Sequence, residues 1–246
     1  MSNSNVSLKG KNVVITGASK GIGKAVANLF AAEGANLFLC ARNEVNLYNT
    51  VAVLQTNNSD ALIKAKAFDL SKKEQAIGFG NWVNQQATAD ILVNNAGLFL
   101  PGSVHNEADG ILEQMIETNV YSAYHLTRVL LPKMMAHASA SSAGYIFNIC
   151  SIASLHAYNN GGSYSISKFA LLGFSKNLRE ELKPYNIKVC AISPGAILTD
   201  SWGDYDNSKN RIMEADDIAK IILTAVKLSP AAVVEDIVLR PQLGDL

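Results

Sequence analysis

The sequence predicts an α/β fold, a single domain over residues 1–246 in which helices cover both faces of a doubly wound sheet of seven mainly parallel strands. Three observations predict it. Short runs rich in apolar and β-branched residues alternate with helical patterns throughout the chain. The length of 246 residues suits one large domain, and neither a repeat nor a linker divides it. Hydrophobic residues make up 48% and charged residues only 17%, which favours an ample core.

Strands and helices are expected in regular alternation. Buried runs interpreted as strands lie at residues 12–16, 37–41, 63–68, 91–93, 145–149, 187–192 and 235–240. Helices are expected at residues 24–34, in segments ending near Thr56 and Ala87, and at 107–137, 163–183 and 215–228. Pro132 implies a kink or break near the end of the helix at 107–137, and residues 1–10 are interpreted as a polar tail.

The helix at residues 163–183 has the clearest boundaries. Turn-forming asparagines and glycines at 159–162 precede it, and Pro184 stops it. Its predicted apolar stripe repeats every four residues and consists of Ala170, Phe174, Leu178 and Leu182. Tyr164 and Lys168 are also four residues apart, so both side chains are expected on one face, within reach of each other.

A tyrosine beside a lysine can transfer protons. A free phenol ionises at about pH 10, and an ammonium about 4 Å away favours the phenolate by about 4 kcal/mol at an effective dielectric of about 20. The pKa of Tyr164 is therefore expected to fall by roughly three, towards neutrality, as a general acid or base requires. A surface tyrosine beside a solvated lysine is the structural alternative. Tyr205 and Lys209 repeat the spacing, but in a polar segment interpreted as a solvated loop.

Composition excludes several classes of function. The 21 Lys and Arg residues balance the 21 Asp and Glu residues and form no basic run, which argues against nucleic acid or an anionic membrane as partner. No apolar stretch reaches the length of a membrane span, and the start lacks the features of a signal peptide. Cysteines and histidines show no metal-binding spacing; Cys40, Cys150 and Cys190 are expected to be buried thiols. A soluble, cytoplasmic protein without a metal is expected.

A glycine-rich turn follows the first strand. TGASKGIG places Gly17, Gly21 and Gly23 between a strand and a helix, where glycine lets the backbone approach a pyrophosphate and the helix N-terminus favours its charge. A purely structural tight turn would look the same. The second strand ends in Ala41-Arg42, without the acid that binds the adenosine ribose of NAD. Lys20 and Arg42 instead suit a 2′-phosphate, hence NADP, unless they are ordinary surface cations.

Together these motifs resemble the classical short-chain dehydrogenase/reductase family over nearly the whole chain, and the resemblance implies a Rossmann-type fold. TGASKGIG corresponds to the family's TGxxxGxG, and residues 94–97 correspond to its NNAG. Asp69 corresponds to the aspartate that binds the adenine, and residues 194–199 match the PGxxxT stretch at the nicotinamide end. The residues that fall on the family's catalytic tetrad are Asn119, Ser151, Tyr164 and Lys168.

The resemblance implies a mechanism. Hydride passes from C4 of NADPH to a carbonyl carbon while Tyr164 gives its proton to the developing alkoxide. Ser151 hydrogen-bonds that oxygen, and Lys168 lowers the tyrosine pKa and binds the nicotinamide ribose. Asn119 holds a water that links Lys168 to solvent. Taken singly, Ser151 could be a strand-end cap, Asn119 a polar helix residue and Asp69 a turn former.

The expected cofactor contacts combine the glycine turn with the strand ends. They are Gly17, Ser19, Lys20, Gly21, Ile22, Gly23, Arg42, Asp69, Leu70, Asn94, Ala96, Gly97, Tyr164, Lys168, Pro194, Gly195, Ile197 and Thr199. The expected substrate pocket contains Ser151 with Tyr158 and Trp202, because aromatic side chains suit a planar substrate. His156 is a weaker candidate, and Cys150 is expected to pack on the opposite side from Ser151.

The resemblance implies a small-molecule substrate, a carbonyl compound or the corresponding alcohol. The tail VVEDIVLRPQLGDL and the stretch PGAILTDSWG are similar to bacterial sepiapterin-reductase-like members, which implies a pteridine ketone. Alternatives are another ketone, such as a 3-oxoacyl thioester or a sugar, or a non-catalytic NADP-binding protein. Residues 200–211 are short for a lid, which suggests an open pocket. Family members commonly form homodimers or homotetramers through the helix at 163–183 and the one before it.

Overall fold

The computed structural model describes residues 7–58, 61–139, 142–199 and 202–245. Within them the main sheet has seven strands: β1 (Asn12–Thr16), β2 (Asn36–Ala41), β3 (Ile63–Ala67), β4 (Ile91–Asn94), β5 (Gly144–Ile149), β6 (Ile187–Pro194) and β9 (Asp236–Leu239). Their order is β3-β2-β1-β4-β5-β6-β9, and every described pairing is parallel. This confirms the predicted sheet. Most of the predicted polar tail falls on residues 1–6, outside the described part of the chain.

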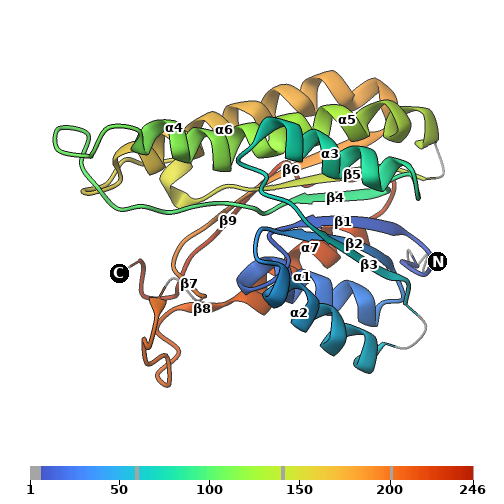
Figure 1. Cartoon of the computed structure of the whole chain (residues 1–246), viewed down its shortest axis with the longest axis horizontal. Coiled ribbons are helices and arrows are strands. Elements are labelled where there is room, and N and C mark those ends of the chain that lie inside the picture. The colour runs from blue at the N-terminus through green and yellow to red at the C-terminus, as the bar shows by residue number, and fades with distance from the viewer. Residues whose placement is uncertain (1–6, 59–60, 140–141, 200–201, 246) are drawn as a thin grey trace.

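Helices cover both faces of the sheet (Figure 1). They are α1 (Gly21–Ala32), α2 (Glu44–Asn57), α3 (Lys73–Asn84), α4 (Ile111–Ile116), α5 (Ser122–His137), α6 (Gly162–Leu182) and α7 (Ala215–Val226). The helices α1, α2 and α7 lie on one face, and α3, α5 and α6 lie on the other. Two short strands, β7 (Ile197–Leu198) and β8 (Met213–Glu214), pair outside the main sheet and were not predicted.

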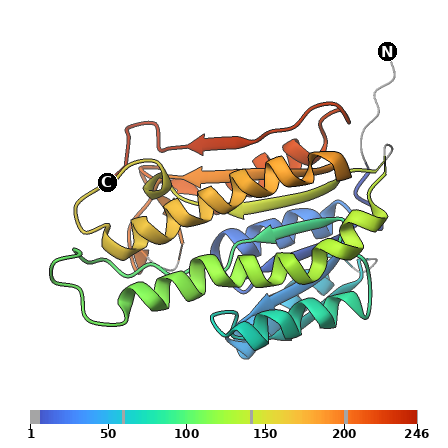
Figure 2. The same ribbon diagram turned by 90° about the horizontal axis from the view of Figure 1, so that it is seen from above.

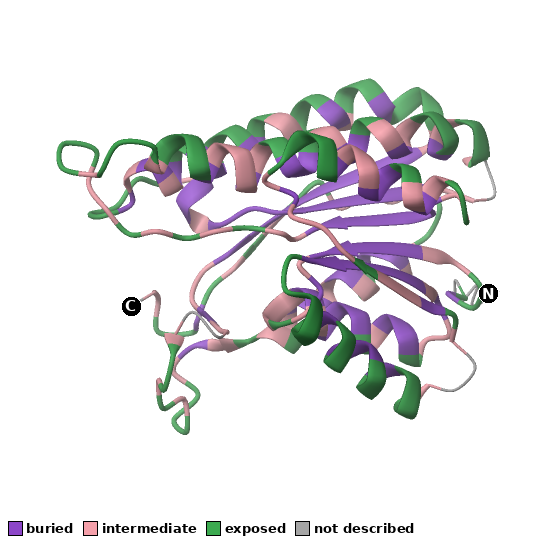
Figure 3. Ribbon diagram, viewed as in Figure 1, coloured by how far each residue is buried: buried purple, intermediate pink, exposed green. Residues whose placement is uncertain are grey.

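The core forms two layers because alternate residues of each strand face opposite sides. Val13 and Ile15 of β1 pack towards α1 and α7, whereas Val14 packs towards α3 and α5. The central strands are almost wholly buried between the helix layers (Figure 3), whereas the edge strands β3 and β9 are partly exposed. As predicted, Cys40, Cys150 and Cys190 are buried free thiols.

The chain reverses its direction across the sheet between β1 and β4. Strands β1 to β3 extend towards one edge, and the chain then returns to place β4 on the other side of β1. The carboxyl ends of all strands point to one edge of the sheet (Figure 2). Ligands of such folds bind where the strand order reverses, outside these carboxyl ends. Residues that follow β1 and β4 therefore define the place to look for a site.

Two expectations about helices are wrong. The helix at 107–137 begins only at Ile111. Of the kink or break expected at Pro132, the break is absent because α5 continues through this residue, and a π-helical turn at Glu117–Tyr121 lies instead between α4 and α5. The stripe predicted for α6 fails at Ala170, which is exposed, although Leu178 and Leu182 are buried. The buried face includes Ser175 instead, whose hydroxyl donates to Leu171 O (2.8 Å) and accepts from Asn148 Nδ2 (2.8 Å). Because its hydroxyl is satisfied by these hydrogen bonds, Ser175 can be buried although a hydrophobic pattern does not predict it there.

Candidate active site

The glycine turn joins β1 to α1 and is shaped by backbone contacts. Gly17 and Gly21 have φ values of 64° and 51°, in the left-handed region that favours glycine. A Cβ atom on Gly23 would lie 2.4 Å from Gly17 O, so that position admits no side chain. The predicted helix at 24–34 starts earlier than expected, at Gly21, and its cap residue Lys20 makes no side-chain capping bond. The first turn of α1 therefore presents backbone N–H groups towards the strand ends, as an anion site requires.

The segment after β4 is tied to this turn. Thr16 Oγ1 accepts hydrogen bonds from the backbone nitrogens of Asn95 and Ala96, each at 2.9 Å. Asn95 Nδ2 donates to Thr16 O (2.9 Å) and Gly17 O (3.2 Å). Asn95 was not among the predicted cofactor residues, and its role is to lock the ends of β1 and β4 together. Asn94 was a predicted cofactor residue, but its side chain is buried among α5 and β5, where Nδ2 donates to Thr127 Oγ1 (3.1 Å) and Asn148 Oδ1 (2.8 Å).

Residues predicted to hold the adenosine end lie at the ends of β1, β2 and β3. Lys20 and Arg42 are both exposed there. Ser19 O accepts from Thr50 Oγ1 at 3.2 Å, which ties the glycine turn to α2. Asp69 accepts hydrogen bonds from Ser71 N (3.1 Å) and Ser71 Oγ (2.8 Å), so it shapes a turn, as the structural alternative anticipated. Two other predicted cofactor residues pack into the protein. Ile22 is partly buried against the core, and Leu70 is buried.

Tyr164 and Lys168 lie on the first turns of α6 and do lie close together. Lys168 Nζ is 5.7 Å from the centre of the Tyr164 ring and donates to Ile149 O at 2.8 Å. Lys168 is 5% exposed, and burial lowers the pKa of its ammonium to about 8. A Cβ on Gly97 would lie 3.7 Å from Lys168 Nζ, and Asn95 of the same NNAG segment lies against Gly17, so this segment runs between the lysine and the glycine turn. The alternative of a solvated lysine is wrong for this pair.

The predicted downward shift of the Tyr164 pKa is wrong for this structure. Burial raises the pKa of Tyr164 above 10, and its hydrogen bond with Ser151 only partly offsets that effect. The predicted shift counted only the attraction of a nearby ammonium for the phenolate, whereas in the structure desolvation is the largest effect on both groups. Tyr164 therefore keeps its proton at neutral pH and is able to donate it.

Ser151 has the capping role considered for it, and its hydroxyl is also placed next to Tyr164. It caps the short 3₁₀ turn Ile152–Ser154, with Oγ accepting from Ala153 N at 3.1 Å. Because that bond uses a lone pair, the hydroxyl proton remains able to donate towards Tyr164 or a substrate oxygen. Cys150 packs beside Leu171 and Leu172 of α6, and burial raises its thiol pKa. A thiol held in its neutral form is a poor nucleophile.

Asn119 lies within the π-helical turn and is almost fully buried. Its Oδ1 accepts from Leu98 N (2.7 Å), and its Nδ2 donates to Leu98 O (2.9 Å) and Ser167 Oγ (2.8 Å). It thus joins the segment after β4 to α6, one residue before Lys168. Turns of this kind occur frequently at functional sites. Neither the π turn nor Ser167 was predicted, because a π turn has no simple sequence pattern.

The stretch predicted for the nicotinamide end begins at Pro194, the last residue of β6. Thr199 approaches the glycine turn, since a Cβ on Gly21 would lie 3.1 Å from Thr199 Cγ2. Ile197 forms part of β7, which pairs with β8. The C-terminal tail also reaches this stretch: Asp245 Oδ1 accepts from Ala196 N at 3.1 Å, and a Cβ on Gly195 would collide with it. That contact, between residues distant in sequence, was not predicted.

Aromatic side chains flank Tyr164. The ring of Phe99, which was not predicted, meets the Tyr164 ring edge-on at 4.8 Å and is 46% exposed. Tyr158 is equally exposed, and burial together with the neighbouring Tyr164 raises its pKa to about 12. Trp202 packs on Tyr205 with ring centres 5.3 Å apart, and among the described residues it has no ring contact with Tyr164. His156 is exposed.

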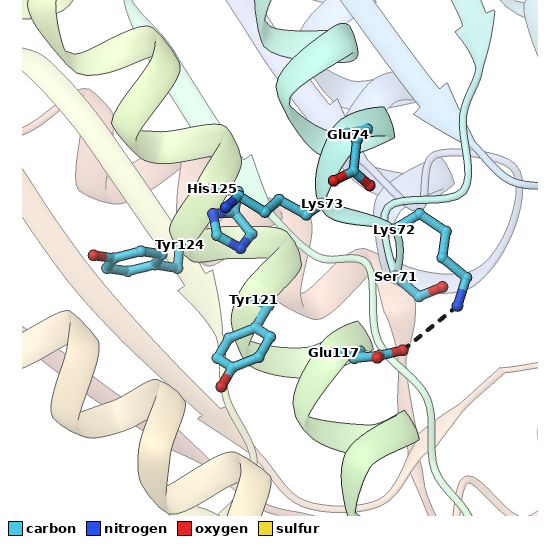
Figure 4. Close-up of a pocket in the computed structure, with 8 residues that line it drawn as sticks. All are labelled: Ser71, Lys72, Lys73, Glu74, Glu117, Tyr121, Tyr124 and His125. Atoms are coloured by element: carbon cyan, nitrogen blue, oxygen red, sulfur yellow. Dashed lines mark ion pairs between the residues drawn. The ribbon is translucent and has the colours of Figure 1, made fainter.

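Two other features lie outside the tetrad. The second tyrosine–lysine pair is in an irregular segment, and Lys209 is exposed, as predicted. The segment 200–211, expected to be too short for a lid, begins with residues 200–201, which lie outside the described chain. A shallow cavity of about 490 Å³ between the start of α3 and α5 is lined by none of the predicted site residues (Figure 4). Lys72 there pairs with Glu117 at 3.7 Å.

Comparison with known proteins identifies the family. The family model of short chain dehydrogenases matches residues 11–210. The chain belongs to this family. As a member it is an oxidoreductase, and the predicted resemblance is confirmed. It is 30% identical to an uncharacterized oxidoreductase of Staphylococcus saprophyticus, over 96% of this chain and 99% of the relative.

Solved structures of dehydrogenases and reductases are also similar. The L-sorbose reductase of Gluconobacter frateurii, complexed with NADPH and L-sorbose, has a TM-score of 0.87 at 28% identity, covering 96% of this chain and 97% of that one. A 7α-hydroxysteroid dehydrogenase complexed with NADH and 7-oxo glycochenodeoxycholic acid has a TM-score of 0.87 at 29% identity, covering 100% of this chain and 98% of that one. In the part of this dehydrogenase that is described, no helix is long and apolar enough to cross a membrane.

Proposed function

We propose that this dehydrogenase is an NADPH-dependent reductase of a ketone or another carbonyl compound. The observation that carries the proposal is a partly buried, protonated Tyr164, hydrogen-bonded to Ser151 and next to the charged, buried Lys168, at the carboxyl edge of the sheet. A phenol that keeps its proton in such a place can deliver it to a group that enters the site. A carbonyl oxygen that becomes an alkoxide is such a group.

The residues present fit a dinucleotide. Gly17 and Gly23 pack closely against Asn95 and the backbone of the turn, and this packing fixes the turn beside the N-terminus of α1, where the pyrophosphate would be held. Lys20 and Arg42, with no acid at the end of β2, support a 2′-phosphate and hence NADP. The L-sorbose reductase holds NADPH, which supports the same choice. When bound, the cofactor supplies the hydride.

Residues of the chain would supply the proton that the carbonyl oxygen takes up. Tyr164 Oη would donate to the carbonyl oxygen, and the Ser151 hydroxyl would hydrogen-bond that oxygen as negative charge develops on it. The ammonium of Lys168, held by Ile149 O, would stabilise the phenolate left behind and bind the nicotinamide ribose. Asn119 would position a water that connects Lys168 to solvent. These assignments extend the family's tetrad to this chain residue by residue.

The pH dependence of cofactor capture is expected to follow Lys168. Its pKa of about 8 means that its charge is present below that pH and is lost above it. We expect kcat/KM for NADPH, which reports the free enzyme, to fall by about tenfold per pH unit above about 8. Steady-state kinetics between pH 6 and about 10 measure this. A profile that is flat to pH 10 would contradict the assignment of Lys168, whereas the exposed variant Lys209→Gln should keep the wild-type inflection.

The cofactor preference is expected to depend on Arg42. In Arg42→Asp, a carboxylate faces the position of the 2′-phosphate, so the ratio of kcat/KM for NADPH over NADH should fall by about 10-fold to 100-fold. Lys220→Asp, which changes an exposed cation of α7 in the same way, is the matched control and should leave the ratio unchanged. A wild-type enzyme that uses NADH as well as NADPH would contradict the choice of NADP.

For the substrate we propose a ketone with a flat or apolar portion. Phe99 and Tyr158 flank the tyrosine and are exposed, so they could contact such a portion. A pteridine ketone of the sepiapterin type fits this description. The similarity to the L-sorbose reductase favours a sugar ketone as the second candidate. NADPH oxidation with sepiapterin, L-sorbose and a 3-oxoacyl thioester separates them.

We further propose that the enzyme is a cytoplasmic homodimer or homotetramer. Exposed apolar side chains lie along the outer side of α4 to α6, namely Leu112, Tyr121, Tyr124, Ile166 and Phe169. Helices α5 and α6 lie side by side there (Figures 1 and 2), and the rings of Tyr124 and Phe174 are 5.7 Å apart. A second copy of the chain would cover this face, as is common among family members.

A further inference from the structure

The helix that carries Tyr164 has no cap of its own. Its cap residue, Gly161, has no side chain to accept from the first N–H groups of α6. Glu107, from the segment between β4 and α4, takes this role across 56 residues of sequence. Glu107 Oε1 accepts from Ser163 N at 2.9 Å, and Oε2 accepts from the hydroxyl of Ser163. A carboxylate at a helix N-terminus is also favoured by the helix dipole.

The side chain of Glu107 fits between two glycines. A Cβ on Gly102 would lie 2.7 Å from Glu107 Cγ, and a Cβ on Gly162 would lie 2.0 Å from Glu107 Oε1. Any larger residue at either position would displace the carboxylate from Ser163. The position of Glu107 is therefore set by the backbone on both sides of it.

The same two segments are joined at a second point. Gly102 N donates to Asn160 O at 3.1 Å, and Ser103 Oγ donates to Asn160 Oδ1 at 3.0 Å. Asn160 has a φ of 60°, a conformation that asparagine tolerates better than most residues. We name the group Gly102, Ser103, Glu107, Asn160 and Ser163 the loop clamp. It lies at the carboxyl edge of the sheet, where the segment before α4 meets the segment before α6 (Figures 1 and 2).

We propose that Glu107 is a positioning residue for Tyr164. It fixes the nitrogen of Ser163, the residue immediately before Tyr164, and so determines where the first turn of α6 begins. The segment that holds Glu107 also carries Phe99, whose ring lies 4.8 Å from the Tyr164 ring. The loop clamp thus fixes the position of Tyr164 relative to the neighbouring ring of Phe99. The inference rests on the proposed function, because it assumes that Tyr164 is the proton donor.

The test compares three variants with the wild type. Glu107→Ala removes both hydrogen bonds and should lower kcat by about 10-fold to 100-fold, the cost of a small misplacement of a reacting group. Its affinity for NADPH, measured by cofactor fluorescence, should stay within about twofold of wild type, because the glycine turn is not touched. Glu107→Gln can still accept from Ser163 N and donate to its hydroxyl, so kcat should recover to within about fivefold. Asp109→Asn, an exposed carboxylate two residues away, is the matched control and should leave kcat unchanged.

Amide hydrogen exchange gives a readout that does not need turnover. The Ser163 amide should exchange faster in Glu107→Ala than in the wild type, and Glu107→Gln should restore its protection. Wild-type kcat in Glu107→Ala, or a loss of NADPH affinity as large as the loss of kcat, would overturn the positioning role. Full activity in Tyr164→Phe would instead overturn the proposed function. The two failures are therefore distinguishable.

Discussion

Replacing Tyr164 by phenylalanine is expected to lower kcat for carbonyl reduction by about 10³-fold or more, while the affinity for NADPH stays near that of the wild type. The variant removes one hydroxyl from a partly buried ring and leaves the edge-on contact with Phe99 in place. What is lost is the proton that burial keeps on the phenol and the hydrogen bond with Ser151. General acid catalysis by a positioned side chain contributes about 10²-fold to 10⁴-fold. NADPH consumption in the presence of a reducible carbonyl compound measures the effect.

The second tyrosine–lysine pair provides the control. Tyr205→Phe removes the same hydroxyl from a tyrosine that has the same spacing to a lysine but lies outside α6. It should retain wild-type kcat. A comparable loss of kcat in both variants would mean that losing any tyrosine hydroxyl lowers activity, and the loss in Tyr164→Phe would then not identify a catalytic residue. Turnover by Tyr164→Phe equal to that of the wild type would remove Tyr164 from the reaction.

Replacing Lys168 by methionine is expected to abolish efficient use of NADPH and yet to stabilise the fold. Burial lowers the pKa of Lys168 from 10.5 to about 8, so the desolvated charge costs about 3 kcal/mol of folding free energy at pH 7. Methionine fills a similar volume without that charge. Subtracting about 1 kcal/mol for the lost hydrogen bond to Ile149 O leaves an expected gain of about 2 kcal/mol. A lysine kept at such a cost indicates that the charge is needed for activity.

Urea unfolding at several pH values measures the stability change. Folded Lys168 releases its proton at about pH 8 and unfolded lysine at 10.5, so between these values the unfolded chain binds more protons. The free energy of unfolding of the wild type should therefore rise from about pH 8 towards 10.5, and Lys168→Met should lack this rise. Lys209→Met, at an exposed position, should match the wild type throughout. A Lys168→Met protein less stable than wild type at pH 7 would show that burial costs less than the contact with Ile149 provides.

The main sheet and the glycine turn are predictable because local chemistry determines them. The β-rich run before Gly17 and the three glycines indicate a strand, a tight turn and a helix wherever they occur. Tyr164 and Lys168 share a face for a similarly local reason, which is the period of the helix. Asn119 and Ser151 could be placed only through the family resemblance, since each has an ordinary structural role that fits its sequence context equally well.

The missed features depend on contacts between distant parts of the chain. Glu107 meets Ser163, and Asp245 meets Ala196, across 56 and 49 residues of sequence. Phe99 contacts Tyr164 because the segment after β4 passes beside the first turn of α6. No rule of residue spacing predicts this contact. The pKa of Tyr164 was predicted in the wrong direction for the same reason. The position of a charged neighbour can be inferred from helical spacing, but the burial of both groups depends on how the whole chain packs.

Transfer of isotope from the cofactor tests the central claim most directly. The enzyme is incubated with NADPH carrying deuterium at C4 of the nicotinamide, in each of the two possible configurations, together with the carbonyl compound it reduces fastest. Mass spectrometry of the alcohol should find deuterium on the former carbonyl carbon for one configuration, and Tyr164→Phe should yield about 10³-fold less labelled product. An alcohol that carries no deuterium from either form, or labelled product formed as fast by Tyr164→Phe, would contradict the account.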